Sequence, residues 1–490
     1  MRSFPIEIEV DEHADTPVFL KIARALMNDI RRGRLKPGAV LPSSRTLATS
    51  LGVHRNTVLA AYRELTAEGW IETEAARGTF VSASMPEMPA QRAAGKQRSV
   101  ANQKIGFDLP ARAGSNAAVR QDESGMLQLS AGKPDVRLLP TELIARAYRR
   151  AARATDKHLF DYGDPRGDAR LREALAAMLG SVRGVVTTAD EVLVTRGSQM
   201  ALDVTARALL SPGDVVAVES LGYRPAWEAM RQTGARIVSL PIDEEGLSVD
   251  ALEHLLSKEA IRAVYLTPHH QYPSTVLLSS PRRLRLLDLA RTHRFAVIED
   301  DYDHEFHYDG RPVLPLASAD RAGVVVYIGT LSKILAPGIR IGFVVAPSPM
   351  LERLAAVRTF IDRQGDHAVE RAIADLLEDG EVQRHARRMR RIYQERRDLL
   401  ANTLRKHLGG ALEFTVPSGG IAMWLRVAED LDVDAWVERA AEKKLSVHAG
   451  RRYAFDGRSR PYLRVCFASL NDREIRDAVA RLAASCPRPK

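Results

Sequence analysis

The first residues of this chain to suggest chemistry are a lysine and an aspartate. Lys333 follows Ser332 in the segment 327–340, and Asp300 lies 33 residues upstream, where it follows the apolar run 295–299. A lysine amine can form an imine with a carbonyl compound and exchange it with an incoming amine. A carboxylate at the end of a strand can pair with a ring nitrogen and keep it protonated. The two residues therefore predict a site that holds a carbonyl-bearing cofactor covalently.

The neighbouring Asp301 is a second candidate for this carboxylate. Successive side chains of a strand point to opposite faces, so Asp300 and Asp301 cannot both face the lysine. We favour Asp300, because it comes directly at the end of the apolar run and because Tyr302, two residues on, shares its face.

The elements that position this pair extend from about Met126 to the C-terminus. Apolar, strand-like runs alternate there with amphipathic stretches, which favours an α/β domain with a mainly parallel sheet covered on both faces. The expected strands are 191–195, 215–219, 263–267, 296–299, 324–328 and 342–346. From about 350 to 490, a long charged helix (Val382 to Leu404) precedes a smaller α+β subdomain.

Residues 126–490 resemble the fold-type-I aminotransferases, whose cofactor is pyridoxal 5′-phosphate. The resemblance implies that Lys333 holds this cofactor as an internal aldimine and that Asp300 pairs with its pyridine nitrogen. Arg464 matches the arginine that clamps a substrate carboxylate through paired hydrogen bonds. The other implied cofactor contacts are Tyr302 at O3′, Tyr223 on the ring, Gly197, Ser198, Gln199, Ser332 and Arg340 around the phosphate, and Tyr162 from the neighbouring subunit.

One turn departs from the family pattern. The segment 270–274, His-Gln-Tyr-Pro-Ser, replaces the usual Asn-Pro-Thr-Gly turn, so a contact of His270 with O3′ is in doubt. Each element alone also has a plainer explanation: the Gly-Ser-Gln at 197–199 as a helix cap, Lys333 as a surface residue, Asp300 as a turn former and Arg464 as a structural ion-pair partner. Their joint occurrence in family order favours the cofactor site.

A second group of motifs lies near the N-terminus, where residues 16–84 favour three short helices and a β-hairpin. We expect Thr16 to cap the first helix, and Ser43 or Ser44 to cap the second. The third helix runs from about Arg55 to Glu68, and the hairpin strands are 70–73 and 78–81. This order of elements is typical of a winged helix-turn-helix.

The basic charge of the chain is concentrated in this region. Nine lysines or arginines lie in residues 21–63 against one acid, Asp29, while the whole chain has a formal charge of +9. Such a block suits a polyanionic partner. The strings 41–48, 51–58 and 77–81 resemble the GntR family of bacterial regulators, which implies binding to double-stranded operator DNA.

Positions within this motif give the expected DNA contacts. The recognition helix opens with residues 54–57, and N-terminal residues of such a helix reach base edges in the major groove. Arg55 can pair with guanine, and Asn56 with adenine. Alternatively, the domain mediates protein contacts, and its arginines are solvated surface charges. The complete set of DNA-binding candidates is Ser43 and Arg45 for phosphates, His54, Arg55, Asn56 and Thr57 for bases, and Arg77, Gly78 and Thr79 in the wing.

The remaining features set broad limits. Residues 85–125 have the composition of a linker, although a strap around the next domain is an alternative. The two cysteines, Cys466 and Cys486, lack metal-ligand spacing, so we expect a reduced compartment and no metal site. No signal-peptide core and no run of 18 apolar residues occur, so we expect a cytoplasmic protein without a membrane partner, associated with the nucleoid when bound to DNA.

A winged helix, a linker and an aminotransferase-like domain in this order resemble the MocR/GabR group of regulators. The resemblance implies a homodimeric, pyridoxal-phosphate-dependent transcription regulator. It would sense a small amine or amino-acid effector, or the cofactor itself, through Lys333. A working aminotransferase that carries a DNA-binding domain is the alternative, and whether any turnover is physiological is left open. The sequence does not identify the operator, the effector or the sign of regulation.

Overall fold

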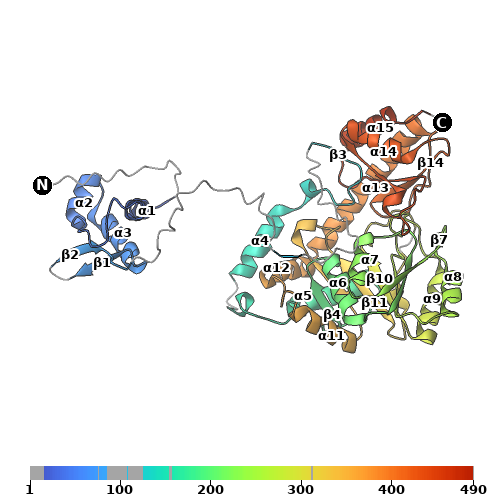
Figure 1. The fold of residues 1–490 in the computed structure, drawn as a ribbon, viewed down its shortest axis with the longest axis horizontal. Coiled ribbons are helices and arrows are strands. Elements are labelled where there is room, and N and C mark those ends of the chain that lie inside the picture. Colours follow the sequence, from blue (N-terminus) through green and yellow to red (C-terminus); the bar gives the residue numbers. More distant parts are fainter. Residues whose placement is uncertain are drawn as a thin grey trace. The chain divides into compact units, whose positions relative to one another are not determined.

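The computed structural model describes residues 16–74, 77–84, 107–108, 125–153, 157–310 and 313–488 (Figure 1). The chain divides into two compact units, residues 1–116 and residues 117–490. The predicted linker, apart from Phe107, Asp108 and Gly125, lies outside the described residues. Among the helices of the described ranges, none combines the length and apolar character needed to cross a bilayer.

The first unit contains three helices and a hairpin. Its elements are α1 (Val18–Arg31), α2 (Ser44–Leu51), α3 (Arg55–Ala67), β1 (Ile71–Glu74) and β2 (Gly78–Val81). Leu26, Val58 and Leu65 are fully buried in its core, because apolar residues recur along one face of each helix. The expected Thr16 cap of α1 is wrong, since Pro17 holds the cap position and no described side chain bonds to the helix start.

The second unit is built on a seven-stranded sheet of order β4-β12-β11-β10-β9-β5-β6. β12 runs antiparallel to its neighbours β11 and β4, and the other pairs are parallel, so the sheet is mainly parallel as predicted. The sequence prediction did not include β6. The strands are β4 (Val192–Thr195), β5 (Val215–Glu219), β6 (Arg236–Leu240), β9 (Ala263–Leu266), β10 (Ala296–Asp301), β11 (Val325–Thr330) and β12 (Gly342–Val345).

Alternate residues of these strands face two separate cores. In β4, Val192 and Val194 belong to one core and Leu193 belongs to the other. The first core is covered by α4 (Thr141–Ala152), α5 (Ala169–Arg183), α8 (Val249–Leu256), α9 (Ser280–His293), α10 (Leu316–Ala319) and α12 (His367–Glu378). The second is covered by α6 (Ser198–Leu209), α7 (Arg224–Arg231) and α11 (Ser348–Thr359). The unit therefore has three layers, with helices on both faces of the sheet (Figure 1).

A smaller sheet of order β13-β14-β17-β16 lies in the C-terminal part, with α13 (Glu381–Leu408), α14 (Val433–Glu442) and α15 (Asp472–Ala484) around its core. Its boundary differs from the expected start at about 350, because α11 and α12 pack on the large sheet. The short strand β3 (Leu127–Gln128) pairs with β15 (Leu445–Ser446), so the chain enters this unit beside the smaller part. The other short strands are β7 (Ile242–Asp243), β8 (Gly246–Leu247), β13 (Leu412–Glu413), β14 (Ala422–Val427), β16 (His448–Ala449) and β17 (Tyr462–Cys466).

Candidate cofactor pocket and nucleic-acid interface

Lys333 lies in the loop that follows β11. Its Nζ donates a hydrogen bond to the Gly132 carbonyl at 2.6 Å, which joins two segments that are far apart in the chain. Burial lowers the pKa of the Lys333 amine, and the nearby Arg464 guanidinium lowers it further. A lowered pKa increases the fraction of neutral amine, which is the form that attacks a carbonyl carbon.

Asp300 lies at the carboxyl end of β10 and is 5% exposed. The Tyr265 hydroxyl donates to its Oδ2 at 2.9 Å, whereas Oδ1 has no hydrogen-bond partner among the described residues. Burial raises the pKa of Asp300 to about 7, although the Tyr265 hydrogen bond and the charge of Lys333 act in the opposite direction. A buried carboxylate of this kind is stabilised by a cationic partner.

Asp301 points to the other face, as strand alternation requires. It accepts a hydrogen bond from the Tyr327 hydroxyl at 2.7 Å and lies 3.1 Å from His304 Nδ1. Arg183, at 3.8 Å, adds a buried positive charge. Although burial alone raises the pKa of Asp301, the nearby His304 and Arg183 lower it below its usual range. Asp301 thus belongs to a buried network with Tyr327, His304 and Arg183, on the face of the strand opposite Asp300.

The Arg340 guanidinium lies against the start of α6. Gly197 holds the cap position with φ of 80°, and a Cβ there would lie 3.2 Å from the Arg340 guanidinium. Arg340 donates to the Arg196 carbonyl at 2.6 Å. Gly342 lies so close to this turn that a Cβ would be 2.6 Å from the Gly197 carbonyl carbon. The backbone amides at a helix start and a guanidinium together suit a phosphate group.

The remaining predicted phosphate residues lie at the start of α6 and in the loop after β11. Ser198 is the first residue of α6. The side chain of Gln199 donates to the Pro225 carbonyl at 3.2 Å and so ties α6 to α7. On the other side, the Ser332 amide donates to the Thr330 hydroxyl at 3.1 Å, which shapes the turn that presents Lys333.

Arg464 on β17 is 2% exposed and lies near Lys333. Its guanidinium stands 4.5 Å from the centre of the Tyr272 ring and donates to Cys466 Sγ at 3.0 Å. A Cβ at Gly132 would lie 3.4 Å from Arg464 Nη1, so Lys333 and Arg464 meet on the same glycine. Its Nε has no hydrogen-bond partner among the described residues.

Aromatic rings line the space between these groups. The ring of Tyr272 meets those of Tyr223 and Tyr302 edge-on, at centroid distances of 5.6 and 6.0 Å. The Tyr302 hydroxyl donates to the His270 carbonyl at 3.0 Å. The His270 ring itself bonds to Asp303 through Nδ1 at 2.7 Å, so the predicted O3′ contact of its side chain stays a prediction.

Tyr162 lies at the surface, with 75% of the residue exposed. The Arg363 guanidinium lies 4.3 Å from its ring centre. Among the described residues, none of the pocket residues above bonds to Tyr162 or stacks on it, and its predicted action on a neighbouring subunit stays a prediction.

The predicted base-reading residues open α3. His54 caps this helix by accepting a hydrogen bond from the Asn56 amide at 3.2 Å. Arg55 and Asn56 are exposed in the first turn, while Thr57 is half-buried. Arg55 Nε donates to Ser44 Oγ at 3.2 Å, which orients the guanidinium without using its terminal nitrogens. This geometry leaves two parallel N–H groups for a base edge.

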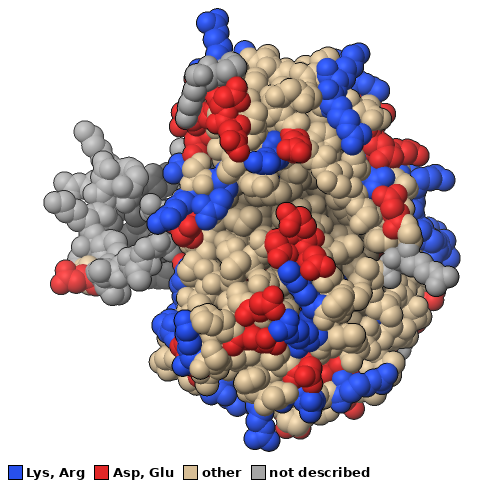
Figure 2. Space-filling view, turned by 90° about the vertical axis from the view of Figure 1, so that its right-hand side faces the viewer, with Lys and Arg blue, Asp and Glu red and all other residues tan. Residues whose placement is uncertain are grey.

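The predicted phosphate and wing residues also lie at the surface of the first unit. Arg45 is exposed on α2, directly after the capped helix start. In the wing, Arg77 pairs with Glu74 at 2.8 Å, and Gly78 adopts a φ of 113° that favours glycine. Thr79 lies beside Thr73 across the hairpin. On the face of the second unit seen in Figure 2, by contrast, basic and acidic side chains lie in mixed groups.

Several residues of the pocket were not assigned a role from the sequence. Tyr265 is paired in register with Ile298, so strand alternation places it on the face of Asp300, and its hydroxyl in an apolar run was a usable signal. Cys466 shares a face with Arg464 for the same reason. Gly132 and Asp303 carry no local signal, because only the folded chain brings them to Lys333.

Two families match the chain. Residues 20–81 match bacterial regulatory proteins of the gntR family, and residues 124–482 match aminotransferase class I and II. The winged helix and the pocket together therefore define a DNA-binding transcription regulator with an aminotransferase-like second unit. The chain belongs to the aminotransferase class I and II family and, through its GntR winged helix, to the regulators of the MocR type.

Individual relatives include both regulators and enzymes. The probable rhizopine catabolism regulatory protein MocR of Rhizobium meliloti is 32% identical over 88% of this chain and 86% of its own. The 2-aminoadipate transaminase of Thermus thermophilus is 32% identical over 73% of this chain and 89% of its own. The crystal structure of LysN, an alpha-aminoadipate aminotransferase of that organism, superposes with a TM-score of 0.69 at 30% identity, over 74% of this chain and 92% of LysN.

Pyridoxal 5′-phosphate, the cofactor that this membership implies, fits the residues of the pocket. Asp300 Oδ1 is a buried carboxylate oxygen available to the pyridine nitrogen. Arg340 and the start of α6 suit the phosphate, and Lys333 would hold the cofactor covalently. When bound, the cofactor supplies a carbonyl carbon and an electron-withdrawing ring.

Proposed function

We propose that this regulator senses a small amine that carries a carboxylate, such as an amino acid, in the pocket around Lys333. The observation that supports this most directly is the meeting of Lys333 and Arg464 at Gly132. The amine of such an effector would take the place of the Lys333 amine. Its carboxylate would accept paired hydrogen bonds from Arg464. An effector of this kind would displace the Lys333 Nζ from the Gly132 carbonyl.

The connection of this pocket to the DNA-binding unit is proposed to run through β3. Gly132 follows β3 closely, and β3 is the first strand after the predicted linker. The Cys466 amide donates to the Leu129 carbonyl at 2.7 Å, and Ser130 bonds to Ser446 through their hydroxyls at 2.7 Å. Effector binding at Gly132 would therefore shift β3 and the residues that follow it, which come directly after the linker. Coupling between two sites requires such a difference between the bound and the free state.

A homodimer is part of this proposal. Tyr162, Phe160 and Phe360 are 75%, 66% and 91% exposed, which is unusual for large aromatic residues in a folded unit. Burial of such residues stabilises subunit contacts. A two-fold dimer would also present two winged helices to a palindromic operator.

Two other functions are supported by specific observations. A working aminotransferase is supported by the complete set of Lys333, Asp300 and Arg464 and by the similarity to the 2-aminoadipate transaminase. A sensor of the cofactor itself is supported by the pyridoxine biosynthesis regulator PdxR of Corynebacterium glutamicum, which is 30% identical over 81% of both chains. Turnover assays with amino donors and keto acids test the first, and operator binding titrated with cofactor alone tests the second.

The proposal is tested with an operator selected from random duplex DNA. Operator affinity is measured with and without amines that carry or lack a carboxylate, in the wild type, in Arg464→Ala and in Arg426→Ala. Arg426 is an exposed arginine on β14 that pairs with Glu429, so it serves as the control. We expect a shift of about 5–150-fold in the wild type and in the control. Arg464→Ala should lose this shift for carboxylate-bearing amines; an unchanged response would remove the effector role of Arg464.

A further inference from the structure

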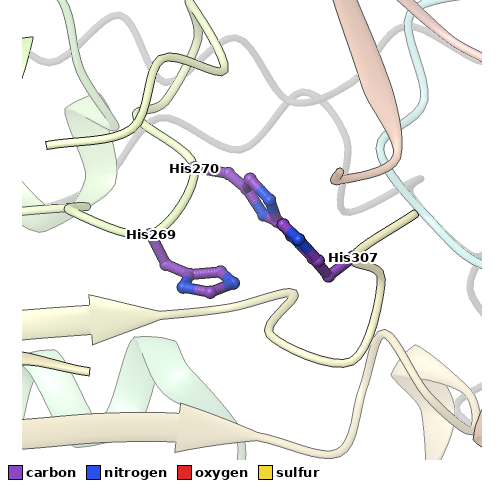
Figure 3. A group of neighbouring side chains, drawn as sticks. All are labelled: His269, His270 and His307. Atoms are coloured by element: carbon purple, nitrogen blue, oxygen red, sulfur yellow. The ribbon is translucent and has the colours of Figure 1, made fainter. Parts of the chain in front are cut away.

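Three histidines gather at the carboxyl ends of β9 and β10 (Figure 3). His269 and His270 follow β9, and His307 follows β10. They are 1%, 1% and 7% exposed. One ring nitrogen of each lies within 4.8 Å of the others, and the rings of His269 and His270 are 4.5 Å apart between centroids. Segments remote in sequence thus bring three imidazoles to one buried point.

The ring nitrogens of this cluster lack ordinary partners. Both nitrogens of His269, both of His307 and Nε2 of His270 make no hydrogen bond of good geometry with a described residue. The Asp309 backbone interacts with the His307 ring. Buried polar groups are normally paired, because water is lost when they are buried. A neutral imidazole carries a lone pair on one of its two ring nitrogens, so each of the three rings can offer one nitrogen to a ligand.

The remaining nitrogen has the partner that a metal-binding histidine needs. Nδ1 of His270 bonds to Asp303 Oδ1 at 2.7 Å. A carboxylate on the second ring nitrogen fixes the orientation of a metal-binding imidazole and raises its basicity. This contact leaves Nε2 as the nitrogen of His270 that can bind an ion.

We propose that His269, His270 and His307 bind one divalent transition-metal ion of the zinc class. Imidazole nitrogens suit Zn²⁺ and Co²⁺, and three such ligands leave a fourth position for water or another donor. Zn–N bonds of about 2.0–2.1 Å place the nitrogens of a tetrahedral site about 3.3 Å apart. The rings would close to that spacing by rotation of their side chains. The sequence predicted no metal site, because these histidines come from two separate loops.

The position of the cluster gives this ion a structural consequence. The backbone of His307 bridges to Gly419, and Gly419 packs so closely on His270 that a Cβ there would overlap Nε2. The ion would therefore link the loops after β9 and β10 where they meet the segment 418–420. A pocket of about 140 Å³, lined by His304, His307 and the exposed Arg387, gives a route to the surface. This site goes beyond the proposed sensing of an amine.

The test uses the full chain after dialysis against a chelator. Co²⁺ is titrated and followed by its visible d–d absorption, Zn²⁺ is added as competitor, and elemental analysis gives the stoichiometry. We expect one ion per chain in the wild type. His307→Gln should weaken binding by at least roughly 100-fold, and Asp303→Asn by about 10–100-fold. His385→Gln removes another buried histidine, on α13, and should bind as the wild type does.

Further measurements separate this site from unfolding and from the cofactor. Circular dichroism checks the fold of each variant, and Zn²⁺ should raise the Tm of the wild type but not that of His307→Gln. Lys333→Ala, which cannot attach the cofactor covalently, should still bind one Co²⁺. Absence of stoichiometric Co²⁺ from the wild type would overturn the proposal. Loss of Co²⁺ from Lys333→Ala, or its full retention in His307→Gln, would overturn it as well.

Discussion

Replacing Arg55 with alanine is expected to weaken operator binding and to relax its sequence preference. Arg55 is exposed in the first turn of α3, and its Nε is held by Ser44 Oγ at 3.2 Å. The two terminal nitrogens of the guanidinium are therefore not used by this bond and can form a fork on a base. A fork of this kind on guanine is worth about 1–3 kcal/mol of discrimination against other bases. That range corresponds to roughly 5–150-fold in Kd for each bound head.

Two variants separate base reading from charge. Arg45→Ala removes an exposed arginine from α2 and should weaken all duplexes about equally, because a phosphate contact carries no sequence information. It should also reduce the slope of log K against log salt by about 0.9 for each lost contact. Ser44→Ala keeps both charges and removes only the bond that orients Arg55. Its cost should be smaller, roughly 0.5–1.5 kcal/mol for one side chain that must be ordered on binding.

The assay is fluorescence anisotropy on the selected operator and on single-base variants, over a series of salt concentrations. Wild type and Arg55→Ala should differ mainly at one base pair of each half-site. Identical base preferences in the two proteins would refute the base-reading role of Arg55. If Arg55→Ala loses affinity with the same sequence dependence and salt dependence as Arg45→Ala, Arg55 contacts a phosphate instead of a base.

Three further predictions concern the second unit. Lys333→Ala should fold and bind the operator, but it should lose both the covalent attachment of the cofactor and the response to amines. Borohydride reduction of the wild type followed by peptide mapping identifies the labelled lysine, and a label on another lysine would contradict the assignment. Burial raises the pKa of Asp300 to about 7, above its unfolded value, so the folded state binds more protons and loses stability as pH rises from about 4 to 7. In cofactor-free protein, the Tm of Asp300→Asn relative to that of the wild type should therefore be higher at pH 8 than at pH 5. An equal Tm difference at the two pH values would argue against a raised pKa of Asp300. Tyr162→Ala should weaken cofactor retention in the dimer while Lys333 still reacts, and unchanged retention measured by absorbance after gel filtration would exclude a role across the interface.

Local patterns were sufficient to predict most elements of the fold. The runs 215–219 and 342–346 correspond closely to β5 and β12, because continuous apolar residues suit strands that are buried on both faces. The strand β6 was missed, since its residues are exposed or half-buried except for Leu240. β10 continues to Asp301, two residues beyond its prediction, because Asp300 and Asp301 pair with Ile328 and Gly329 of β11. Strand ends therefore depend on neighbours that the sequence does not reveal.

The sequence by itself determined the class of each unit, because that class depends on periodicity and on residues close in the chain; the roles of Lys333 and of the helix at 55–67 stay predictions. Only the tertiary structure decided which distant loops meet. Lys333 bonds to Gly132 across 201 residues, and His307 joins His269 and His270 from another loop. Side-chain alternation says which residues share a face of one strand. Which loops converge at the end of that strand depends on the order of strands in the sheet, and that order is set by long-range packing that no local pattern encodes.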